Sequence, residues 1–390
     1  MGRSPILSDE LLMRCHERAP DYDRENRFFQ EDFDEIRETD YLRMAIPEKF
    51  GGLGMSLAEV GMETRRLAYH APPTALALNM HHYWVGVALE VSKSGDSSVD
   101  WILEEAGKGE IFAAGHAETG NDLPSLLSTT RAEKVDGGYK FYGRKSFGSL
   151  TPVWTRLGIH GMDSSDPDNP KVIHAFIKRE DEGYEIKETW DVLGMRATRS
   201  DDTILDGVFA PDAYIGRIVP AGRAGIDEFV FAIFVWALTG FANVYYGIAR
   251  RAMDLTLESL EKKTSIGLSG SMARHPEVQH SIAEMYTELE SIGAHLDRFQ
   301  EEWSNGVDHG SEWPAKLIAT KYHAVEGAWR IVDTAMDVSG GFGMFKKSEL
   351  ERLFRDARAG RFHPANSALA HEFISKTILG IDDTQPLRWG

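Results

Sequence analysis

The sequence is almost free of cysteine. It contains a single one, Cys15, in 390 residues. One thiol can form neither a disulfide within the chain nor a cysteine cluster for zinc. The first twenty residues also lack the apolar stretch of a signal peptide. These absences predict a protein of the reducing cytoplasm.

Basic residues are in the minority. The chain has 43 Lys and Arg against 61 Asp and Glu, which gives a formal net charge of −18. Binding to a phosphate backbone requires clustered lysine and arginine, so we expect no nucleic acid partner. A small anionic ligand is not excluded, because it responds to local positive groups and helix N-termini.

The rest of the composition is that of a globular protein, with 42% hydrophobic and 27% charged residues and no internal repeats. The pattern along the chain changes twice. Residues 1–112 are predicted to be helical, residues 113–225 to form a β domain, and residues 226–390 to return to helices that form a four-helix bundle. The expected fold is therefore mainly α with an inserted β domain.

Local signals place several elements. Ser56 with Glu59 three residues later predicts a capping box, and Asp9 is expected to cap the first helix. A turn at residues 136–138 predicts a hairpin. The uncharged stretch 229–249 is long enough to cross a membrane, but its flanks carry no basic anchors. We therefore expect a buried core helix there, and no membrane partner.

Two further features bear on a site. His81 and His82 are adjacent on a predicted helix and cannot share a face, so no metal site is expected. Residues 339–367 combine a glycine turn, a short charged helix and a loop that Pro364 stiffens beside His363. This combination is typical of a cofactor edge, although a plain helix corner with a surface histidine fits the spacing equally well.

Six further segments matter for their order and spacing along the chain: residues 46–54, 118–122, 143–149, 193–198, 340–343 and 355–357. Taken in order, these motifs resemble the acyl-CoA dehydrogenase family of flavoproteins, from about residue 33 to residue 380. The resemblance implies an N-terminal helical domain, a middle β domain, a C-terminal four-helix bundle and FAD as the cofactor, with FMN as the second choice. It also implies a homodimer or homotetramer, and a heteromer stays possible.

The resemblance assigns flavin-binding roles by position. The implied residues are Glu118, Thr119, Asn121, Phe147, Ser149, Lys262, Gly340, Gly341, Gly343 and Asn366. Phe147 would pack on the ring, and Ser149 would donate its hydroxyl near ring nitrogen N5. Lys262 stands where the family usually has arginine, and it would meet the diphosphate of a neighbouring subunit's cofactor. The alternative is that Phe147 and Ser149 are ordinary strand residues.

The chain departs from the family at the catalytic base. Pro364 stands at the position of the usual glutamate, and Ala237 stands at the second position where some members carry it. Removing a proton α to a thioester needs a positioned base. His363 is the nearest candidate, with Glu118 and Glu228 behind it. Arg355 and Asp356 are expected to form a structural ion pair beneath the flavin edge.

Several functions follow from this departure. The first interpretation is α,β-dehydrogenation of an acyl-CoA or an acyl-carrier-protein thioester, with electrons passing to electron-transfer flavoprotein or another acceptor. The second is a flavin-dependent monooxygenase of the same fold, in which His363 would assist oxygen chemistry at the flavin. The third is a non-catalytic partner subunit. A protein that binds acyl-CoA or lipid without any flavin is a further alternative.

Overall fold

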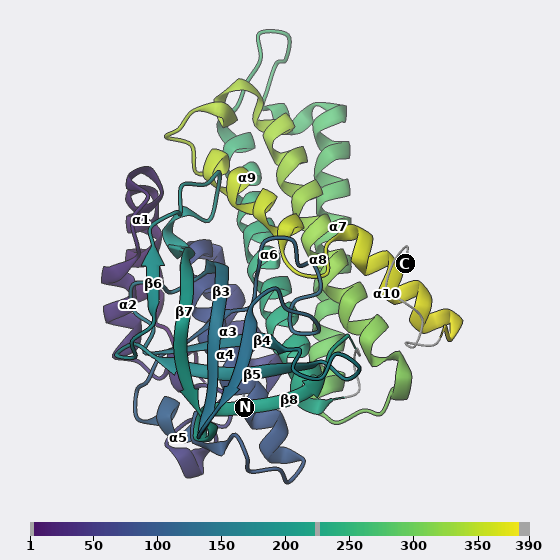
Figure 1. The fold of residues 1–390 in the computed structure, drawn as a ribbon. Helices are drawn as coiled ribbons and strands as arrows, with labels where there is room; N and C mark the ends of the chain where they lie inside the picture. Colours follow the sequence, from purple (N-terminus) through teal and green to yellow (C-terminus); the bar gives the residue numbers. More distant parts are fainter. Residues whose placement is uncertain (1–3, 223–226, 382–390) are drawn as a thin grey trace.

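The computed structural model describes residues 4–222 and 227–381. Three parts follow one another along the chain: helices α1–α5, one eight-stranded sheet, and helices α6–α10 (Figure 1). The expected mainly α fold with an inserted β part is confirmed. The predicted domain limit at residue 225 lies outside the described residues.

The N-terminal helices begin where short polar residues cap them. The Ser56 hydroxyl accepts a hydrogen bond from the Glu59 amide, and the Glu59 carboxylate accepts from the Ser56 amide, so the predicted capping box is confirmed. The first helix is capped by Ser8, not by Asp9 as predicted, and Asp9 lies in its first turn. The helices are α1 (Asp9–Glu25), α2 (Gln30–Arg37), α3 (Leu57–His70), α4 (Pro72–Lys93) and α5 (Asp100–Gly107).

The sheet has the strand order β6-β7-β3-β2-β4-β5-β8, and β1 pairs in parallel with β4. The predicted hairpin is confirmed, with Gly137 at a φ of +75° between two antiparallel strands. The strands are β1 (Phe112–Gly115), β2 (Arg131–Val135), β3 (Gly138–Gly148), β4 (Arg156–Asp163), β5 (Lys171–Lys178), β6 (Tyr184–Lys187), β7 (Asp201–Pro211) and β8 (Ile215–Pro220).

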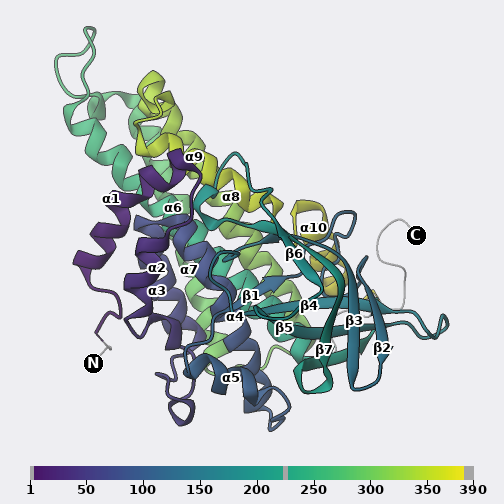
Figure 2. The ribbon, with the colours of Figure 1, turned by 60° about the vertical axis from the view of Figure 1, so that its left-hand side comes forward.

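Close contact fixes α4 against the sheet. A Cβ added to Gly158 of β4 would lie 2.2 Å from the Trp84 ring, so glycine leaves the room that this indole occupies. The Trp84 Nε1 atom also donates to the Ala113 carbonyl at 2.9 Å. Figure 2 shows the strands on one side of α4 and the longer helices on the other.

The C-terminal helices are built around α6, which packs against α3, α4 and α8. Among the described residues, α6 is the one helix long and apolar enough to cross a membrane, yet 83% of its most apolar window is buried inside the protein. The expected core helix is therefore confirmed. The helices are α6 (Glu228–Lys262), α7 (Pro276–Ser304), α8 (Trp313–Ser339), α9 (Glu349–Ala359) and α10 (Ser367–Leu379).

Candidate functional site

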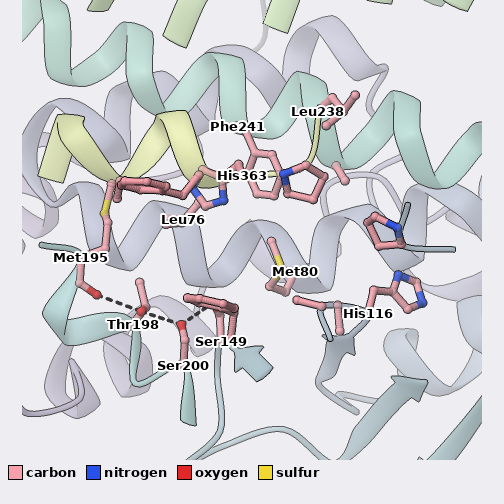
Figure 3. A pocket seen from close by; sticks show the side chains of 18 of the residues that line it. Leu76, Met80, His116, Ser149, Met195, Thr198, Ser200, Leu238, Phe241 and His363 are labelled. Atoms are coloured by element: carbon pink, nitrogen blue, oxygen red, sulfur yellow. Dashed lines mark hydrogen bonds between the residues drawn. The ribbon is translucent and has the colours of Figure 1, made fainter. Parts of the chain in front are cut away.

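A cavity of about 430 Å³ lies where the sheet, α4, α6 and the connection from α9 to α10 meet (Figure 3). Its size is in the range of small-molecule sites, and most of its lining is apolar. Helix α4 contributes Leu76 and Met80, and α6 contributes Leu238 and Phe241. The motif at residues 193–198, recognised from the sequence, supplies part of the opposite wall.

Two aromatic side chains stand at the end of β3. Phe147 is 61% exposed despite its size, and its ring meets the Trp190 ring edge-on at 5.8 Å. Phe147 adopts a φ of +57°, where the pairing of β3 with β7 shifts register between Lys145 and Gly148. The bulge turns Phe147 and Ser149 towards the same cavity, which both line.

A chain of hydroxyl groups runs along this wall. The Ser149 Oγ atom lies 2.7 Å from the Ser200 Oγ atom, which lies 2.7 Å from the Thr198 Oγ1 atom. Thr198 in turn donates to the Met195 carbonyl at 2.8 Å. Figure 3 shows the chain below His363, on the opposite side of the cavity.

His363 lies on the wall opposite the hydroxyl chain and is half-buried. Its imidazole stacks on the Phe241 ring at 4.3 Å, and its Nε2 atom lies 2.8 Å from the Tyr245 hydroxyl. Burial lowers the pKa of His363 to about 3, and the Lys321 ammonium acts in the same direction. The imidazole is therefore neutral at physiological pH.

Arg355 and Asp356 are predicted to form an ion pair with each other, and this prediction is wrong. The Arg355 guanidinium instead pairs with Asp23 at 2.6 Å and with Glu351 at 2.8 Å. The Asp356 carboxylate accepts from the Met195 amide at 2.5 Å, and burial raises its pKa to about 6. Arg355, which also lines the cavity, donates to the Leu193 carbonyl at 3.0 Å, so both residues join α9 to the segment at residues 193–195; their structural role stays a prediction.

Glu118 does not line the cavity. Its carboxylate accepts from the Lys145 ammonium at 2.6 Å, from the Ser128 hydroxyl at 2.7 Å and from the Thr130 amide at 3.0 Å. Burial by itself would raise the pKa of Glu118, but the Lys145 charge and these donors hold it at about 2. The other acidic candidate, Glu228, is exposed in the first turn of α6. Neither carboxylate is placed to act as a base in this cavity.

Other residues predicted to bind the cofactor do not line the cavity. Thr119 is exposed, and the Asn121 amide donates to the Leu127 carbonyl at 2.7 Å, which closes the loop after β1. The Asn366 side chain accepts from the Leu369 amide at 3.2 Å and caps α10. Of the residues predicted from the resemblance, the structure brings Phe147, Ser149 and His363 to the cavity.

The segment predicted to meet a neighbouring subunit's cofactor lies outside the cavity. The glycine turn, with Gly340, Gly341 and Gly343, is a short 3₁₀ helix, and Lys262 is exposed at the end of α6. It is Lys263 that reaches this turn, where it donates to the Ser339 carbonyl at 2.9 Å. The cofactor roles of Lys262 and the glycines stay predictions.

Sequence reasoning did not identify several lining or supporting residues. Phe241 and Tyr245 are four positions apart on α6, so both reach His363 from one helix face. That spacing was a usable signal. The bond between Thr198 and Ser200 joins residues only two positions apart, but nothing local indicated the bond of Ser200 to Ser149, which lies 51 positions earlier in the chain.

Comparisons with known proteins agree with this architecture. Models of the acyl-CoA dehydrogenase N-terminal and C-terminal domains match residues 11–95 and 239–368. YdbM of Bacillus subtilis (strain 168), named provisionally as an acyl-CoA dehydrogenase, is 26% identical over 92% of each chain. Indole-3-acetate monooxygenase of Pseudomonas putida is 24% identical over 96% of this chain and 92% of its own. A nitrososynthase structure from Micromonospora carbonacea var. africana superposes with a TM-score of 0.82 at 22% identity, covering 95% of each chain.

Proposed function

We propose that the chain, which belongs to the acyl-CoA dehydrogenase family of flavin-dependent oxidoreductases, is a flavin-dependent monooxygenase. The proposed cofactor is FAD, with FMN as the second choice. From the sequence alone, this function is the second interpretation, after acyl thioester dehydrogenation.

One observation carries the proposal. Among the described residues that line the cavity there is no aspartate or glutamate, and the imidazole facing it has a pKa of about 3. The efficiency of a general base follows its pKa, so such an imidazole is a poor acceptor for a proton α to a thioester. Oxygenation needs no such base in the cavity wall, because no carbon-bound proton has to be removed before oxygen is transferred.

The residues present fit a flavin ring. Phe147 and Trp190 offer aromatic surfaces on the sheet side, and Ser149 adds a hydroxyl oxygen at the end of the hydroxyl chain along this wall. When bound in its reduced form, the flavin supplies two electrons, so that one atom of O₂ enters the substrate and the other leaves as water.

The chain's own residues then have distinct tasks. The apolar side chains of α4 and α6 exclude water and hold an uncharged organic substrate. The neutral His363, held by Phe241 and Tyr245, presents a hydrogen-bonding group of fixed orientation to whatever occupies the cavity.

The test compares two reactions on one preparation. The protein is loaded with FAD, and acyl-CoAs of four, eight and sixteen carbons are added under argon. The same preparation is then supplied with NADH, a separate flavin reductase, ¹⁸O₂ and a panel of aromatic compounds and amines. Label in a product, with no bleaching of the flavin by any thioester, supports the monooxygenase; bleaching by an acyl-CoA contradicts it.

Acyl thioester dehydrogenation is the second candidate. The similarity to YdbM over 92% of each chain favours it, as does the apolar wall, which suits an acyl chain. In that case His363 would be the base, and electron-transfer flavoprotein or another carrier would be the acceptor.

The assembly is also part of the proposal. Phe342, Met344 and Phe345 are 78%, 76% and 54% exposed on and beside the glycine turn, close to the end of α6. Exposed apolar side chains gathered in one place support burial against another copy of the chain, in a cytoplasmic homodimer or homotetramer.

A further inference from the structure

The hydroxyl chain beside the cavity has a fixed direction. Three hydrogen bonds join Ser149, Ser200, Thr198 and the Met195 carbonyl in that order (Figure 3). Each hydroxyl carries one hydrogen, and a carbonyl oxygen can only accept. Three hydrogens must therefore serve three bonds.

One arrangement satisfies all three bonds. Thr198 donates to the Met195 carbonyl, so Ser200 must donate to Thr198, and Ser149 must donate to Ser200. The Ser149 oxygen then faces the cavity with lone pairs only. The three hydroxyl residues are at most 7% exposed, so bulk water does not compete for these bonds.

The backbone holds the chain in place. The Met195 amide donates to the Asp356 carboxylate at 2.5 Å, and the Leu150 amide donates to the Thr198 carbonyl at 3.3 Å. Helix α9, the motif that carries Thr198, and the end of β3 are thereby joined. Reversing the hydroxyls would remove the shortest of the three hydrogen bonds to the Met195 carbonyl, which also accepts from the Thr198 amide at 3.1 Å and from the Trp190 Nε1 atom at 3.3 Å.

We propose that Thr198 and Ser200 are positioning residues that make Ser149 a hydrogen-bond acceptor, so that the cavity binds reduced flavin more tightly than oxidised flavin. Ring nitrogen N5 carries a hydrogen in the reduced flavin and only a lone pair in the oxidised flavin. The inference rests on the proposed function, because it requires a flavin beside Ser149. It reverses the expectation from the sequence, in which Ser149 donates.

The test measures dissociation constants for FAD and for dithionite-reduced FAD under argon. Wild-type protein is expected to bind the reduced form more tightly. Thr198→Val frees Ser200 to donate to Ser149, which can then donate into the cavity. The ratio of the dissociation constant of oxidised FAD to that of reduced FAD should therefore fall by roughly three- to tenfold, which corresponds to the free energy of one hydrogen bond. The fall should come mainly from tighter binding of oxidised FAD.

Two further variants make the test specific. Thr256→Val removes a buried hydroxyl that donates to the Ala252 carbonyl at 2.7 Å within α6, outside the cavity lining, and it should leave the ratio unchanged. Ser200→Ala interrupts the chain at a second point and should reproduce the effect of Thr198→Val, with folding checked by circular dichroism.

The outcomes separate the inference from the proposed function. Wild-type ratios in both Thr198→Val and Ser200→Ala, with flavin still bound, overturn the role of the hydroxyl chain and leave the monooxygenase proposal standing. Failure of wild-type protein to bind FAD in either oxidation state overturns both.

Discussion

The Nε2 atom of His363 lies 2.8 Å from the hydroxyl oxygen of Tyr245, two residues separated by 118 positions in the chain. The imidazole lies flat on Phe241, with the two rings inclined by 15°. Tyr245 is fully buried, and burial keeps its pKa well above the usual value, so the phenol stays protonated. The pair is therefore a neutral, oriented hydrogen-bonding unit.

Replacing His363 with alanine should slow turnover by roughly three- to tenfold while FAD stays bound, because the variant loses one hydrogen-bonding group on the wall opposite Ser149. Tyr245→Phe keeps the imidazole but removes its partner, and a smaller loss is expected. Stopped-flow turnover and FAD affinity measure the two effects. Wild-type kcat in His363→Ala would make this histidine a bystander.

The same pair predicts a flat pH profile. With a pKa of about 3, His363 does not change charge between pH 5 and pH 8, so kcat should show no step near 6.5 from this group. A step near 6.5 that disappears in His363→Gln would contradict the neutral imidazole.

Buried histidines should make the protein sensitive to acid. Burial lowers the pKa of His81 and His174 to about 4, and that of His82 well below 6.5. Below pH 6.5 the unfolded chain binds protons that the folded chain does not, so the free energy of unfolding should fall as pH drops from 7 to 5.

His82→Phe tests this pH dependence at one site. Among the described residues, neither ring nitrogen of His82 has a hydrogen-bond partner, and the ring meets Tyr41 edge-on at 5.0 Å. Phenylalanine keeps the ring contact and removes the titration. The free energy of unfolding in urea is measured at pH 5 and at pH 7. The difference between the two values should be smaller in the variant than in wild type by about 1–2 kcal/mol. An unchanged difference would be evidence against the low pKa of His82.

The buried pair of Lys145 and Glu118 should be needed for folding. Both side chains are almost fully buried, so Lys145→Met leaves the Glu118 carboxylate without its positive partner. The free energy of unfolding should therefore fall by about 3–5 kcal/mol. Combining Lys145→Met with Glu118→Gln removes both charges, and the loss should be smaller than the sum of the two single losses. Additive losses in denaturant unfolding would show that the two charges are not coupled.

Asn366 offers a test between a helix cap and a cofactor ligand. If its role is the cap of α10, Asn366→Ala should lower the free energy of unfolding by about 1 kcal/mol and leave FAD affinity unchanged. Asn366→Ser keeps a capping oxygen and should restore most of the stability. A large loss of FAD affinity with unchanged stability would instead support the cofactor role implied by the resemblance.

Much of the fold could be predicted because its signals are local. The capping box at Ser56 and Glu59, the hairpin at Gly137 and the apolar periodicity of α6 each depend on residues within a few positions of one another. For the site, the sequence indicated Phe147, Ser149 and His363, because motifs in their expected order surround each of them.

The partners of those residues could not be predicted in the same way. Arg355 was expected to pair with its neighbour Asp356, yet the structure gives it Asp23, 332 positions away. Glu118 was expected at the cofactor, yet Lys145 and the surrounding amides hold its carboxylate inside the β layer.

The sequence by itself determined the order of helices and strands and the absence of a carboxylate at the usual base positions, since both can be read from neighbouring residues. The tertiary structure alone decided which hydroxyl groups are hydrogen-bonded to each other, which charges are paired and how far burial lowers the pKa of His363. Hydrogen bonds and desolvation depend on distances of a few ångströms between segments that lie far apart along the chain.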